Sequence, residues 1–115
     1  MSVFAKSLRT FESNITGETK DYKINNAVWL LLKSKYKLTQ TQWALGYEKE
    51  EVLYGVKFVV CVLKANGVET TEKEVSENTD AVDIMNFTVA YQTAMMSDEN
   101  DSDDNEEQEE DEEGK

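Results

Sequence analysis

The chain has 115 residues and a formal net charge of −12, a length that suits one domain with a modest core and excludes two. Histidine is absent and Cys61 is the only cysteine, so the commonest general base and metal ligand is missing and an internal disulfide is excluded. No apolar run reaches the roughly 20 residues of a membrane span and no signal-peptide stretch opens the chain, so we expect a cytoplasmic protein that is not an enzyme, holds no metal or cofactor and binds no membrane.

The first predicted element covers residues 2–11. Phe4, Leu8 and Phe11 recur at helical spacing and Ser2 is a candidate cap, which predicts a helix, with a strand as the competing interpretation. A turn near residues 14–17 and an extended piece at residues 22–24 then predict a small β-hairpin.

Two helices are predicted next. Asn25 or Asn26 caps the segment "NAVWLLLKSKYK", in which lysines gather late, where cations suit the end of a helix. Its apolar face consists of Val28, Leu31, Leu32 and Tyr36. Thr39 and Gln42 form a capping box for a short helix, which we expect to end at Gly46.

The segment "YEKEEVLYGVKFVVCVLKANG" predicts the central helix of the domain. Its first turns hold Glu48, Glu50 and Glu51, and Asn66-Gly67 is a stop signal. One apolar stripe runs along it, widened by Leu53, Phe58 and Val62, and consists of Val52, Val56, Val59, Val60 and Leu63. Gly55 predicts the close approach of another backbone. Cys61 lies in the apolar run, which predicts a buried core thiol rather than a nucleophile.

Two further helices complete the domain. Thr71 with Glu74 caps a short acidic helix, and Thr79 or Asp80 caps the last helix, "AVDIMNFTVAYQTAMM". One side of this last helix is formed by Ile84, Phe87, Tyr91, Ala94 and Met95. The predicted fold class is therefore mainly α: a small helical domain with a short N-terminal β-hairpin.

The charge is concentrated at the C-terminal end. Twelve of the sixteen residues from Asp98 to Glu113 are acidic and only Lys115 offsets them, whereas residues 1–97 carry 11 bases and 12 acids. A segment without apolar residues that repels itself predicts disorder. We therefore divide the chain into a helical binding domain, residues 1–97, and a disordered acidic tail, residues 98–115.

Two motif-like patterns do not predict the functions that they imitate. The stretch "LTQTQWALGYEKEE" resembles the start of a helix-turn-helix, but the spacing from Ala44 to Gly46 is too short, and the following glutamates would face phosphate. Asp98, Asn100, Ser102 and Glu109 match positions of a calcium loop whose required glycine is replaced by aspartate. We expect no nucleic-acid binding and no calcium site.

Three segments set the layout of residues 1–97: "KDYKINNAVWLLLKSKY", "WALGYEKEEVLYGVKFVVCVLKANG", and "DIMNFTVAYQTAMM" before the acidic end. This layout resembles the tail assembly chaperones of long-tailed phages or prophages of Gram-positive bacteria. The resemblance implies a protein that binds the tape-measure protein, keeps it soluble while tail-tube subunits assemble, and then leaves. It further implies the host cytoplasm, absence from the mature virion, and a longer product made by a ribosomal frameshift.

Other functions and the contact surface stay open at this point. One alternative is a small acidic phage-encoded inhibitor that mimics DNA and binds a host enzyme, and another is a replication accessory built on a β-barrel. Self-association is a further expectation. Trp29, Trp43 and Tyr47 are the candidates for partner contact, because bulky aromatic side chains near short helices anchor interfaces, with a place in the core as the competing interpretation.

Overall fold

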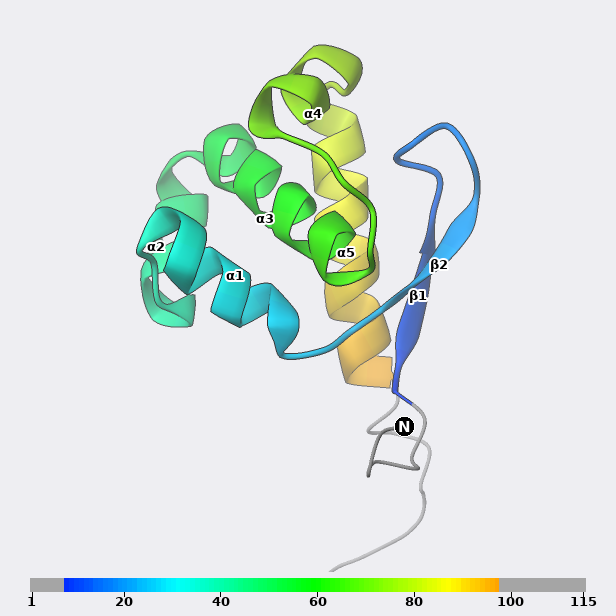
Figure 1. Cartoon of the computed structure of the whole chain (residues 1–115), viewed down its shortest axis with the longest axis horizontal. Coiled ribbons are helices and arrows are strands. Elements are labelled where there is room, and N and C mark those ends of the chain that lie inside the picture. The colour runs from blue at the N-terminus through cyan, green and yellow to red at the C-terminus, as the bar shows by residue number, and fades with distance from the viewer. Residues whose placement is uncertain (1–7, 98–115) are drawn as a thin grey trace, which may run out of the picture.

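The computed structural model describes residues 8–97, which form a hairpin and five helices (Figure 1). In chain order these are β1 (Thr10–Ser13), β2 (Lys20–Lys23), α1 (Ala27–Tyr36), α2 (Gln40–Lys49), α3 (Glu51–Ala65), α4 (Glu72–Asn78) and α5 (Ala81–Ser97). The predicted fold class, mainly α with a short N-terminal hairpin, is confirmed for these residues. The predicted acidic tail, residues 98–115, lies outside the described residues.

The hairpin takes up the end of the helix expected at residues 2–11, since β1 begins at Thr10; residues 2–7 of that prediction lie outside the described residues. β1 and β2 pair in antiparallel register with Phe11 opposite Tyr22, and the Gly17 N–H donates to the Asn14 carbonyl at 2.9 Å across the turn. The helix prediction is therefore wrong from Thr10 onward, and the competing strand interpretation is right there. The ring of Phe11 lies 5.1 Å from that of Phe87, so packing on α5 together with pairing to β2 overrides the local helical spacing.

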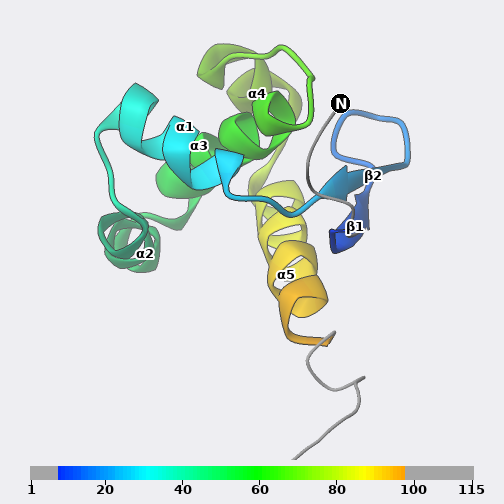
Figure 2. The ribbon, with the colours of Figure 1, turned by 60° about the horizontal axis from the view of Figure 1, so that its bottom comes forward.

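α3 is the central helix, as its broad apolar stripe predicts. It contacts α1, α2, α4 and α5, and Figure 2 shows α1 and α2 on one side of it and the hairpin on the other. Its buried positions are Gly55, Val56, Phe58, Val59, Val60, Cys61, Val62 and Leu63. A Cβ placed on Gly55 would lie 2.2 Å from Ile84 Cγ2, so the close approach is made by a side chain of α5 and not by a backbone.

The boundary between α2 and α3 differs from the prediction. α2 continues through Gly46 to Lys49. The helical conformation is interrupted at Glu50, where φ is −134° and ψ is 77°. Gly46 has a packing role instead, because a Cβ there would lie 2.2 Å from a ring carbon of Tyr54. The Trp43 indole N–H also donates to the Tyr54 carbonyl at 2.9 Å, which holds α2 against the start of α3.

The predicted caps account for most helix beginnings. Thr39 Oγ1 accepts from the Gln42 N–H at 3.1 Å while the Gln42 side chain accepts from the Thr39 N–H at 2.9 Å, a complete capping box. Thr71 Oγ1 accepts from the Glu74 N–H at 3.1 Å at the start of α4. Asp80 and Asp83 exchange equivalent bonds at 2.9 and 3.0 Å at the start of α5, so Asp80 rather than Thr79 is the cap.

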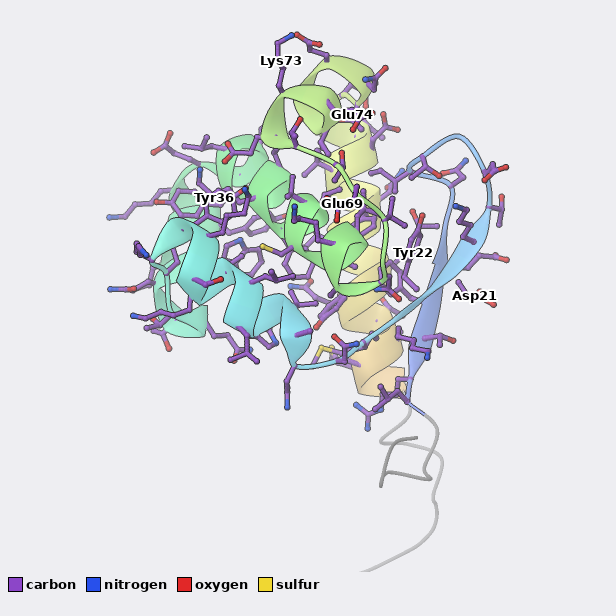
Figure 3. The ribbon with its side chains drawn as sticks, viewed as in Figure 1. Asp21, Tyr22, Tyr36, Glu69, Lys73 and Glu74 are labelled. Carbon is purple, nitrogen blue, oxygen red and sulfur yellow. The ribbon has the colours of Figure 1, made fainter. Side chains whose placement is uncertain are left out.

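Side-chain bonds to the backbone attach the hairpin to the helices. The Asn66 amide, just after α3, accepts from the Lys23 N–H at 2.7 Å and donates to the Lys23 carbonyl at 3.2 Å. The Arg9 guanidinium donates to the Met95 carbonyl near the end of α5 at 2.8 Å. The hairpin is thus held at both α3 and α5, with Tyr22 buried between it and α5 and Asp21 pointing outward (Figure 3).

Candidate binding surfaces

The three residues predicted to contact a partner form one aromatic cluster around Phe58 of α3. The Trp43 ring stacks on Tyr47 with 5.1 Å between ring centroids, and its centroid lies 4.9 Å from that of Phe58. The centroid of the Trp29 ring lies 5.9 Å from those of both Trp43 and Phe58. Trp43 is buried, and Trp29 and Tyr47 are partly exposed. The structure therefore places Trp43 in the core and leaves only Trp29 and Tyr47 with surface to offer.

A small cavity lies beside this aromatic cluster. Its volume is about 220 Å³, and it is lined mainly by Trp29, Trp43, Phe58, Tyr91 and Met95. The cavity separates α2 from the second half of α5. Its size suits a single apolar side chain better than a cofactor, because ligand pockets usually exceed about 300 Å³.

A row of exposed apolar side chains on α5 was not singled out from the sequence. This row, the α5 stripe, consists of Val82, Met85, Val89 and Met96, whose exposed fractions lie between 43% and 67%. Successive members are three, four and seven residues apart, so they share one face of the helix. The only charged residue of α5 is Asp83. The spacing is visible in the sequence, but the more bulky apolar pattern of Ile84, Phe87 and Tyr91 on the opposite face dominates the prediction for this helix.

A groove opens where the beginnings of α3 and α5 meet α4. We call it the acidic groove; its volume is about 570 Å³. The apolar lining residues are Val52, Leu53, Val56, Ala81 and Ile84, and the acidic lining residues are Glu50, Glu51, Glu72 and Asp80. The sequence predicted Val52 and Leu53 to be part of the central apolar stripe, but they line this groove and are 48% and 45% exposed.

The environments of the ionisable side chains Cys61 and Tyr36 suit packing in the core rather than nucleophilic or acid–base chemistry. The Cys61 side chain is buried, as predicted, and desolvation raises the pKa of its thiol to about 11, so the reactive thiolate is suppressed at neutral pH. Burial, followed by the nearby Glu72 carboxylate, likewise raises the pKa of Tyr36. The Lys57 ammonium lies 4.7 Å from the centroid of the Tyr36 ring and 3.7 Å from the Glu72 carboxylate. Its positive charge therefore offsets the negative charge of Glu72 beside Tyr36.

The structure also bears on the two nucleic-acid-binding folds considered from the sequence, the helix-turn-helix and the β-barrel. In the unit that resembles a helix-turn-helix, the second helix would be α3, whose side chains are buried over most of Val56–Leu63. The exposed residues at the start of this helix are Glu51, Val52 and Leu53, so acidic and apolar side chains stand where a recognition helix presents its first residues. Within residues 8–97 the strands form one two-stranded sheet, not the barrel that a replication accessory of that type requires.

The described part of the chain contains neither a metal-binding cluster nor a membrane-spanning helix. Across residues 8–97, no group of three or more histidine, cysteine, aspartate or glutamate side chains is placed to hold a metal ion. None of the helices in that range combines the length and apolar character of a membrane-spanning segment. The residues that imitate a calcium loop, 98–109, lie outside the described residues.

These features define a small helical domain with exposed apolar surfaces. No protein-family model, curated protein sequence or solved structure matches the chain. The function is therefore argued from the surfaces themselves, together with the resemblance drawn from the sequence.

Proposed function

We propose that this protein is a helix-binding module, and that it serves as a tail assembly chaperone whose client is an amphipathic helix of a tape-measure protein. The observation that carries the proposal is the α5 stripe. Four large apolar side chains, each more than two fifths exposed, lie along one face of a helix that has a single charged residue. A face of this kind marks an interaction surface more often than a solvated one.

The spacing of the α5 stripe suits a partner helix. Val82, Met85, Val89 and Met96 occupy positions that alternate by three and four residues if Gln92 is counted between the last two. A second helix packs along such a row by setting its own side chains between these. Two of the four are methionines, whose flexible side chains adapt to clients of varied shape.

The acidic tail supports the same role by its composition. Residues 98–115 carry twelve acids and one base. A strongly anionic segment keeps a complex with an apolar client soluble, because complexes of like charge repel one another. The same charge would attract a basic partner, and we propose that tail-tube subunits dock there during assembly.

The proposal is tested by co-expression of the protein with the products of the neighbouring genes, followed by pull-down. We expect a long helical protein to be retained. Val89→Asp should abolish retention, because it places a charge in the middle of the stripe. The matched control is Leu30→Asp on α1, where a more exposed leucine, 70% against 50% for Val89, lies outside the stripe. Equal retention by both variants would refute the proposal.

A further inference from the structure

The acidic groove has an apolar floor that the fold leaves uncovered. Val56 and Ile84 are buried at its base, whereas Val52 and Leu53 are about half exposed at its mouth. The floor is built from the first turns of α3 and α5, two segments held together where Ile84 packs on Gly55. Because both helices are in the core, the floor is rigid and does not need to form on binding.

The rim of the groove carries charge of one sign. Its charged lining residues are all acidic: Glu50, Glu51, Glu72 and Asp80. Lys57 approaches Glu72 at 3.7 Å and offsets part of this charge. The lysine of α4, Lys73, pairs with Glu77 at 2.8 Å and lies at the outer end of that helix (Figure 3). The potential at the mouth is therefore negative.

The polar groups of the groove do not suit an anionic or strongly hydrogen-bonding ligand. The Ser76 hydroxyl donates to the Glu72 carbonyl, and the Thr79 hydroxyl donates to the Val75 carbonyl at 2.7 Å, so both are engaged within α4. What the groove offers to a ligand is apolar carbon surrounded by carboxylates. The acidic residues 98–115 of the chain itself are repelled from such a surface.

We infer that the acidic groove binds a cationic amphipathic helix of a partner protein, with apolar side chains on Val52 and Leu53 and flanking lysines or arginines near Glu50 and Glu72. The argument is one of charge complementarity: an apolar floor selects the apolar face, and a rim of one sign selects the basic flanks. This site is distinct from the α5 stripe, and the inference does not depend on the proposed function.

The test uses the full chain and two labelled synthetic helices. One helix has leucines on one face and lysines on the other; its match has glutamates in place of the lysines. We expect the lysine peptide to bind in the groove, this binding to weaken as salt is raised, and the glutamate peptide to leave the groove residues unaffected. In the amide NMR spectrum the lysine peptide should shift residues of the groove, among them Val52, Leu53 and Ala81.

Variants separate the groove from charge attraction elsewhere on the chain. Leu53→Lys should weaken binding of the lysine peptide about tenfold, since it places a like charge at the mouth. Glu50→Gln should weaken binding about threefold, whereas Glu48→Gln, an exposed acid of α2 outside the groove, is the matched control and should have no effect. Val89→Asp should leave the NMR shifts of the groove residues intact, which keeps this test independent of the α5 stripe.

Three results would overturn the inference. The first is the absence of binding by the lysine peptide. The second is equal binding by Leu53→Lys, Glu50→Gln and the native protein. The third is a set of NMR shifts confined to residues 98–115, which would show that the peptide is held by the charge of that segment alone.

Discussion

The two faces of α5 have similar composition and opposite environments. Ile84, Phe87 and Tyr91 are at most 3% exposed, whereas the α5 stripe on the other side is half exposed. Both faces carry large apolar side chains at helical spacing. What separates them is contact with α3 and β1, which cover one face only. An apolar row on a helix therefore identifies a surface to be covered, but it does not show whether the covering element belongs to the same chain.

The largest difference between the faces is expected in stability. Phe87→Ala removes a ring that contacts Phe11, Tyr22 and Phe58, so we expect a loss of about 3–5 kcal/mol in the free energy of unfolding. Val89→Ala on the exposed face should cost less than about 0.5 kcal/mol. Urea unfolding followed by circular dichroism measures both. Similar losses at the two positions would mean that the second face is also buried.

The contact between α3 and the buried face can be tested from the α3 side. Gly55→Ala forces a Cβ against Ile84 Cγ2, and overpacking of this kind costs about 1–3 kcal/mol. Ile84→Ala removes the opposing methyl group, so the double variant should be more stable than the sum of the two single losses predicts. Strict additivity in urea unfolding would show that the two residues do not press on each other.

Asp80 caps the start of α5, so it stabilises the helix itself and not the packing of either face. Asp80→Ala removes the acceptor for the Asp83 N–H, which we expect to cost about 1 kcal/mol. Asn retains a side-chain oxygen, so Asp80→Asn should restore most of the loss. The melting temperatures of the two variants decide this. An equal loss from both would assign the effect to the charge of Asp80 rather than to its hydrogen bond.

The smallest effect on stability is expected at the centre of the α5 stripe. Val89→Asp changes a half-exposed side chain that supports no other element, so the free energy of unfolding should change by about 0.5 kcal/mol or less. The same substitution is expected to abolish client retention. A stability loss comparable to that of Phe87→Ala would contradict the assignment of this face to binding.

The core of the aromatic cluster shows why the contact residues were hard to predict. Trp43 sits at helical spacing from Tyr47 and next to the capping box of α2, which says that both lie on one side of a helix. Which side faces α3 depends on the break at Glu50 and on the fit of Tyr54 against Gly46. Those contacts join residues of two different helices, and with them Trp43 is buried while Leu45 and Leu30 are exposed.

Features that depend on near neighbours in the chain followed from the amino-acid order alone. Examples are the capping box at Thr39–Gln42, the cap at Thr71, the hairpin turn before Gly17 and the broad apolar period of α3. Each involves interactions within a few residues, where local geometry fixes the partners.

The other features were determined by contacts between different secondary-structure elements, which the local sequence does not specify. Thr10–Ser13 became a strand when β2 and α5 offered its backbone and Phe11 better partners than a helix would. Gly46 remained inside α2 because the Tyr54 ring needed the space. The division of α5 into a buried face and an open stripe was set by where α3 and β1 pack, and one sequence carries no local signal for that choice.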